Sequence, residues 1–150
     1  MNDESTWEEC IESNASLQGT PDRPKVTSLI DTAAGRVQFL TETGIKESNA
    51  NYVFENYYSS VLELMHALVL LYGYKVGNHI CLGYYLRDIL QRHDLFRLFD
   101  GCRSKRNSLI YHGRKMDYET AKYAIEKAKQ LIVELNKILD VALEKTDRPS

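Results

Sequence analysis

The 150-residue chain has the length of one domain, and its 43% of hydrophobic residues can build a core, which excludes a chain that is disordered throughout. Three prolines and eight glycines are too few for a collagen-like chain and disfavour an all-β chain with many turns. The formal net charge of −2 is unlike that of most nucleic-acid-binding proteins, which are usually basic.

The charge is unevenly distributed along the chain. Residues 1–20 carry five acidic residues and no basic one, whereas residues 86–115 carry eight basic and three acidic residues, a net charge of +5. An acidic segment therefore masks a basic one, and the basic segment remains a candidate anion-binding region. We expect the acidic segment to be a solvated tail; the alternative is that it packs over a basic cleft of its own chain.

Residues 1–24 are predicted to form an acidic leader that ends in the turn-rich segment TPDRP, before a helical domain at residues 25–145 and a polar tail at residues 146–150. Three residues of the leader have the spacing of a short docking helix, Trp7, Cys10 and Ile11.

Apolar residues three or four apart over residues 26–40 predict the first long helix, and Gly44 is suited to end it. A second long helix is expected to begin near Ser48 or Asn49 and to end at Gly73. It is apolar over more than half of its circumference, which predicts a central position in the fold.

Residues 74–77 are predicted to be a linker. Three polar residues are expected to cap the helices that follow, namely Asn78, Asp94 and Asp117, and Gly113 is expected to end the helix that starts at Asp94. No segment shows the alternation of a strand. The sequence therefore predicts an all-α, up-and-down bundle of four to six helices.

The chain contains three cysteines that are far apart and lack the spacing of a zinc site, Cys10, Cys81 and Cys102. Neither a disulfide framework nor a structural zinc ion is therefore expected. The N-terminus lacks the basic and apolar regions of a signal peptide, and no apolar run approaches the ~20 residues that a membrane span needs. These observations favour a cytoplasmic protein without a membrane partner.

Arg106 stands where the apolar repeat of the fourth helix calls for a core residue. An unpaired buried charge costs several kcal/mol, so this arginine needs a salt bridge, a snorkelling path to water or a ligand. Asn107 follows it, and His112 comes six positions later beside Gly113. Six residues span ~240° of a helix, so the two side chains meet only through a broken last turn, the reach of the arginine or a second copy of the chain.

The string RNSLIYHG at residues 106–113 resembles the signature of the HEPN superfamily (higher eukaryotes and prokaryotes nucleotide-binding domains), in which an arginine and a polar residue precede a histidine. The resemblance covers roughly residues 25–145. It implies a helical domain, all-α and HEPN-like, that usually forms a homodimer and brings two Arg/His motifs into one cleft. A tyrosine that some HEPN toxins carry two residues after the histidine is replaced here by Arg114.

Many HEPN proteins are metal-independent endoribonucleases, often toxins of toxin–antitoxin pairs, and this is the function that the resemblance implies here. His112 would be the general acid or base, Arg106 would hold the phosphate, and Asn107 would bind the phosphate or orient a partner. Further basic side chains would guide single-stranded RNA, namely Arg103, Lys105 and Arg114. No metal or other cofactor is expected.

Two alternatives remain open. The first is a non-catalytic HEPN module that binds a nucleotide, RNA, or a protein partner such as an antitoxin of the nucleotidyltransferase type. The second is a structural bundle in which Arg106 forms a salt bridge with Glu63, a residue that otherwise supports the site or lies on the exposed side of its helix. His79 and His93 are expected to be structural or solvent-facing, and the ten tyrosines to lie in the core and a dimer interface.

Overall fold

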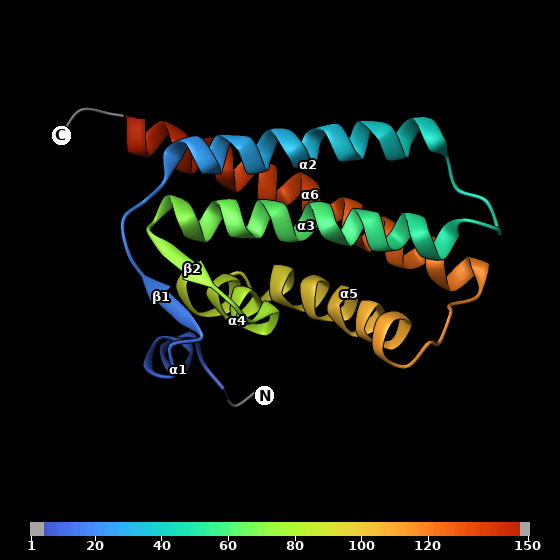
Figure 1. Ribbon diagram of the computed structural model, residues 1–150, viewed down its shortest axis with the longest axis horizontal. Coiled ribbons are helices and arrows are strands. Elements are labelled where there is room, and N and C mark those ends of the chain that lie inside the picture. Colours follow the sequence, from blue (N-terminus) through green and yellow to red (C-terminus); the bar gives the residue numbers. More distant parts are fainter. Residues whose placement is uncertain (1–4, 148–150) are drawn as a thin grey trace.

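The computed structural model describes residues 5–147, and this part of the chain is mostly helical, which confirms the all-α class. The helices are α1 (Trp7–Glu12), α2 (Arg23–Thr43), α3 (Ala50–Leu71), α4 (His79–Tyr84), the π-helix η1 (Tyr85–Ile89), α5 (His93–Tyr111) and α6 (Tyr118–Asp147). The long helices α2, α3 and α6 form the body of the fold, and α5 lies beside them (Figure 1).

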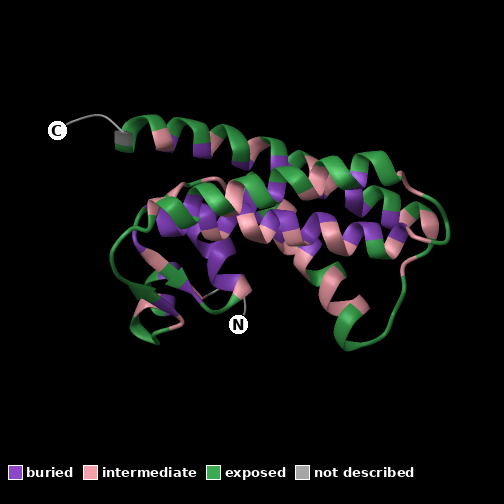
Figure 2. Cartoon of the chain, turned by 45° about the horizontal axis from the view of Figure 1, so that its top comes forward, coloured by how far each residue is buried: buried purple, intermediate pink, exposed green. Residues whose placement is uncertain are grey.

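Helix α3 is the centre of the core, as its apolar circumference predicts. It packs against α2, α5 and α6, and it is the most thoroughly buried of the long helices (Figure 2). Its largest fully buried side chains include Phe54, Tyr57 and Tyr58. A helix that is apolar on most sides is stable only when neighbours cover it on most sides, and these three helices do so.

Most of the predicted helix ends are confirmed. The Asn78 side chain accepts a hydrogen bond from the Ile80 amide at 3.1 Å, and the Asp117 side chain accepts one from the Thr120 amide at 2.8 Å. Gly44 ends α2 with a φ of 76°. The prediction for Asp94 is wrong: α5 begins at His93, and the carboxylate of Asp94 instead accepts two hydrogen bonds from Arg92, each at 3.0 Å.

The prediction that the chain has no strands is also wrong. Strands β1 (Ser16–Gln18) and β2 (Tyr74–Val76) pair in antiparallel fashion, with Ser16 opposite Val76. The predicted linker at residues 74–77 therefore contains a strand. Three-residue strands are too short to show an alternating pattern, and their pairing joins segments that are far apart in the sequence.

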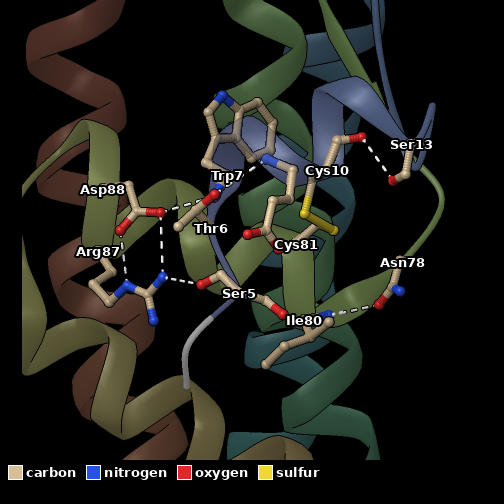
Figure 3. The surroundings of a disulfide bond; sticks show 11 residues. Ser5, Thr6, Trp7, Cys10, Ser13, Asn78, Ile80, Cys81, Arg87 and Asp88 are labelled. Atoms are coloured by element: carbon tan, nitrogen blue, oxygen red, sulfur yellow. Dashed lines mark hydrogen bonds and ion pairs between the residues drawn. A yellow bond between two sulfur atoms is a disulfide. The ribbon is translucent and has the colours of Figure 1, made fainter. Parts of the chain in front are cut away.

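The leader is docked on the domain. The Trp7 ring is 5% exposed and meets the Tyr74 and Tyr85 rings edge to face, with centroids 5.3 and 5.0 Å away. The Trp7 amide donates a hydrogen bond to Asp88 at 2.8 Å (Figure 3). Residues 7–18 therefore contribute to the fold, and the expectation of a solvated tail is wrong for this segment. The acidic residues Asp3 and Glu4 lie outside the described residues.

A disulfide bond joins Cys10 of α1 to Cys81 of α4, and both residues are fully buried (Figure 3). The expectation that the cysteines form no disulfide is thus wrong. Disulfides persist mainly in oxidising compartments, so the cysteines no longer support the expectation of a cytoplasmic location. Within the described residues, no helix has the length and hydropathy needed to cross a membrane.

At the other end, α6 runs to Asp147 and so extends into the predicted polar tail; residues 148–150 lie outside the described part of the chain.

Candidate functional site

Arg106 continues the buried face of α5 and places its guanidinium over aromatic rings. Its Cζ lies 5.8 Å from the centre of the Tyr58 ring and 6.0 Å from that of Tyr111. Tyr58 is 1% exposed and stacks on Phe99, with ring centroids 6.2 Å apart. The core thus presents the face of a tyrosine to the cation, which is a favourable cation–π arrangement.

The predicted salt bridge between Arg106 and Glu63 is not formed. Glu63 accepts two hydrogen bonds from Arg36 of α2, at 3.0 Å from Nε and 3.1 Å from the terminal nitrogen Nη2. No ion pair of Arg106 is found among the described residues. The structural alternative for Arg106 therefore loses its proposed partner, and Glu63 is not part of the site.

A pocket of about 340 Å³ lies between α5 and the start of α4. Helix α5 contributes Arg103, Arg106, Asn107 and Tyr111, while the segment before and within α4 contributes Gly77, Asn78, His79 and Ile80. The oxygen of Asn78 is occupied by the Ile80 amide, because Asn78 caps α4. The polar side chains of the other lining residues carry two guanidinium groups, the amide of Asn107, the imidazole of His79 and the hydroxyl of Tyr111. We call this the Arg106 pocket.

The close approach of α4 to α5 depends on Gly83. A Cβ atom at this position would lie 2.9 Å from Cδ2 of Phe99 and 3.2 Å from Cδ2 of Phe96. Only a residue without a side chain fits at this distance without displacing a ring. Gly83 thereby allows α4 to carry His79 to the Arg106 pocket.

His79 is uncharged at neutral pH in this environment. Burial lowers the pKa of its imidazole, and the positive charges of Arg106 and Arg103 lower it further. Its Nδ1 lies 3.5 Å from the hydroxyl oxygen of Tyr58. Burial raises the pKa of this hydroxyl, which therefore stays protonated. A neutral imidazole can accept a proton or donate a hydrogen bond, and both are useful beside a phosphate.

The other polar α5 residues of the pocket differ in how many of their hydrogen-bond donors are already used within the protein. Arg103 donates to the Asp100 carboxylate at 2.9 and 3.3 Å, so its charge is partly compensated. Asn107 is half-buried, and its side chain forms no hydrogen bond with any described residue. Arg106 and Asn107 are therefore the groups with the most donor capacity left for a ligand.

His112 lies outside the Arg106 pocket. It is the exposed C-terminal cap of α5, where the amides of His112 and Arg114 donate to the carbonyl of Ser108 at 3.2 and 3.1 Å. Gly113, with a φ of 62°, turns the chain away from the helix as predicted. Tyr111, which precedes His112 and is 70% exposed, lines the pocket, but His112 itself does not. Within one protomer, the arginine and the histidine of the motif thus do not line the same pocket.

The two remaining basic candidates also lie elsewhere. Lys105 lines a different hollow, between α5 and α6, and Arg114 is exposed after the end of α5. Of the predicted site residues, the structure therefore brings Arg103, Arg106 and Asn107 together and leaves the others apart. None of the acidic residues of α1 lines the Arg106 pocket, so the described part of the leader does not cover it.

His79 and Tyr58 carry no signal in the sequence that marks them as members of the site. His79 directly follows the residue that caps α4, and Tyr58 belongs to an apolar repeat, so each has a sufficient structural explanation. Their proximity to Arg106 arises from packing between segments 27 and 48 residues away, for which the sequence carries no local signal.

Across the described residues, no group of three or more His, Cys, Asp or Glu side chains is arranged to hold a metal ion. No family model, no curated protein and no solved structure matches this chain. The resemblance to HEPN domains therefore rests on residues 106–113 and on the order of the helices.

Proposed function

We propose that this protein is a HEPN-type endoribonuclease that binds a phosphate of single-stranded RNA in the Arg106 pocket and cleaves the chain without a metal ion, as a homodimer. The observation that carries the proposal is the pocket itself, in which Arg103, Arg106 and Asn107 meet the neutral His79. A pocket with two cations and several neutral hydrogen-bonding groups suits a phosphodiester better than an apolar ligand.

Arg106 is the primary phosphate ligand in this proposal. Its guanidinium can donate two parallel hydrogen bonds to the phosphate oxygens, and it is not neutralised by a carboxylate in the described structure. Tyr111, an exposed residue of the pocket lining, offers an aromatic face on which an unpaired base can stack. Recognition through a stacked base favours single-stranded RNA over a duplex.

The chemical step is attack of a ribose 2′-oxygen on the adjacent phosphorus. The new bond from the 2′-oxygen to phosphorus replaces the bond to the 5′-oxygen, which leaves a 2′,3′-cyclic phosphate and a 5′-hydroxyl. A base takes the proton of the 2′-hydroxyl, and an acid gives a proton to the departing 5′-oxygen. Arg106 stabilises the charge that develops on the phosphate oxygens.

A homodimer supplies the acid and the base. His112 is exposed at the tip of α5 and does not reach the Arg106 pocket of its own protomer, so it is free to approach the pocket of a second copy. His112 of the second copy then serves as base or acid, and the neutral His79 of the pocket is placed to take the other role.

The second candidate function is binding without cleavage, to RNA, to a nucleotide or to a protein partner such as a nucleotidyltransferase-type antitoxin. The separation of His112 from the Arg106 pocket within one protomer favours it, because the pocket alone can hold a phosphate. The two functions share the pocket and differ in whether His112 has a role.

A cleavage assay separates the two. Labelled single-stranded RNA is incubated in EDTA with the wild-type protein and with the Arg106→Ala, His112→Ala and His93→Ala variants; His93 is the exposed control at the far end of α5. The ribonuclease proposal predicts cleavage by the wild type and by His93→Ala, and a loss of about 100-fold or more in the other two. Cleavage abolished by EDTA, or unchanged in His112→Ala, would overturn it; RNA binding without cleavage would establish the binding function.

A further inference from the structure

A second pocket lies on the side of α5 that faces α6. Its volume is about 430 Å³, within the range of small-molecule sites. It is distinct from the Arg106 pocket, with which it shares no lining residue. Its lining comprises Asp94, Arg97, Leu98, Gly101, Cys102 and Lys105 from α5, and Tyr123, Ala124 and Lys127 from α6. We call it the α5–α6 pocket.

Apolar groups form the floor of this pocket. Cys102 and Ala124 are buried, and Leu98 packs partly buried against the core. Gly101 leaves this space open: a Cβ atom there would have no atom within 4 Å. At the rim, the Tyr123 ring is 64% exposed and leaves an aromatic face available. The pocket therefore offers a flat apolar ligand both a floor and a stacking surface.

Three cations surround this apolar floor, Arg97, Lys105 and Lys127. In the described part of the chain, none of them forms a salt bridge. The Nζ atom of Lys127 lies 4.8 Å from the centre of the Tyr123 ring. The positive charge of Lys105 helps to lower the pKa of Asp117, although the two side chains form no ion pair. The carboxylate of Asp94, the acidic residue in the lining, is held by Arg92 through two hydrogen bonds. The pocket thus has an excess of positive charge.

We propose that the α5–α6 pocket binds a small aromatic oxyanion, with its ring on the floor beside Tyr123 and its phosphate or carboxylate group between Lys105, Lys127 and Arg97. Water that fills the pocket solvates the cations but makes no favourable contact with the apolar floor. Inorganic phosphate can pair only with the cations, and an uncharged aromatic molecule can pack only on the apolar floor. A ligand with both parts satisfies both, so it binds more tightly than either part.

Calorimetric titration with 1-naphthyl phosphate tests this, with inorganic phosphate and 1-naphthol as the two half-ligands. The wild type is expected to bind 1-naphthyl phosphate about ten-fold or more tightly than either half-ligand, a difference of one decade in the dissociation constant. Gly101→Leu fills the hollow and is expected to weaken binding about ten-fold or more. The control is Gly35→Leu, at an exposed helical glycine whose Cβ would also meet no atom within 4 Å.

Two further variants make the result specific. Lys105→Gln combined with Lys127→Gln is expected to bring the affinity for 1-naphthyl phosphate close to that for 1-naphthol. The same titrations in the Arg106→Ala background remove the phosphate ligand proposed for the Arg106 pocket, and the preference for 1-naphthyl phosphate over both half-ligands is expected to persist there; this outcome does not depend on the ribonuclease proposal. Equal affinities of the wild type for the three ligands would overturn the proposal, and so would wild-type affinity for 1-naphthyl phosphate in the lysine double variant. The lysine double variant also keeps the test decisive if Gly101→Leu does not fold.

Discussion

The guanidinium carbon of Arg106 lies 5.8 Å from the centre of the buried Tyr58 ring, and no carboxylate in the described structure pairs with it. An arginine that is held over a tyrosine face and retains its hydrogen-bond donors is preorganised for an external anion. A structural arginine in the same protein looks different: Arg36 gives two hydrogen bonds to Glu63.

This contrast predicts opposite effects of removing the two arginines. Arg106→Gln is expected to weaken RNA binding about ten-fold, with a smaller salt dependence, and to leave the free energy of unfolding within about 1 kcal/mol of the wild type. Arg36→Gln is expected to leave RNA binding unchanged and to lower the free energy of unfolding by about 1–3 kcal/mol, because it leaves the half-buried Glu63 without its partner. Fluorescence anisotropy at several salt concentrations and urea denaturation measure the two quantities. Equal stability losses in both variants would contradict the assignment.

Gly83→Val is expected to destabilise the fold by about 1–3 kcal/mol and to weaken RNA binding, because the new side chain must displace the Phe96 or Phe99 ring and move α4 away from α5. Urea denaturation and anisotropy check both effects. Gly35→Val is the matched control at a helical glycine with open space around it. Wild-type stability in Gly83→Val would contradict the close contact between α4 and α5.

The disulfide between Cys10 and Cys81 closes a loop with a sequence separation of 71 residues. Breaking it is expected to lower the free energy of unfolding by about 4 kcal/mol, through the entropy that the unfolded chain regains. Denaturation with and without dithiothreitol measures this, and the Cys10→Ala/Cys81→Ala variant is expected to be insensitive to the reductant. A wild type that is equally stable in reductant would contradict a stabilising role.

The remaining cysteine is expected to be inert in the folded protein. Cys102 is 2% exposed, and burial raises the pKa of its thiol to about 12, so little thiolate exists at neutral pH. Iodoacetamide should label one cysteine per chain, and only after the protein is unfolded without reductant. Rapid labelling of the native protein would contradict the buried position.

Much of the helical architecture could be predicted because its signals are local. The caps at Asn78 and Asp117 and the glycine at residue 44 depend on neighbours within a few residues. The strands and the disulfide depend on contacts between the leader and residues 74–81, which no local pattern reveals. Helix α5 begins two residues earlier than a cap at Asp94 predicts, because Asp94 pairs with Arg92 and does not cap the helix.

The candidate site could be predicted in part for the same reason. Arg103, Arg106 and Asn107 lie on one helix, so their proximity follows from spacing. His79 joins them only because α4 packs on α5. A sequence does not show which of several cations lies next to Glu63 on a neighbouring helix. In the structure that cation is Arg36 of α2 and not Arg106.

The stability of the protein is expected to depend on the protonation of His79. Its pKa is lowered in the folded state, whereas the unfolded chain keeps a value near 6.5, so the unfolded chain binds more protons between the two values. The free energy of unfolding should therefore fall as the pH decreases from 6.5 to the lowered pKa, and level off below it. The lowered pKa of His66 acts in the same direction. Urea denaturation between pH 7 and pH 5 should show a flatter dependence for His79→Asn than for the wild type or for His93→Asn; equal slopes would contradict the burial of a neutral His79.

A complementation assay tests whether Arg106 of one protomer acts with His112 of another. The Arg106→Ala and His112→Ala proteins are mixed, refolded together and assayed on single-stranded RNA in EDTA, with heterodimers counted by native mass spectrometry. The proposal predicts that each variant alone is inactive and that the mixture regains cleavage in proportion to its heterodimers, because one cleft then contains an intact Arg106 and an intact His112. Heterodimers that form and remain as inactive as the separate variants would contradict it.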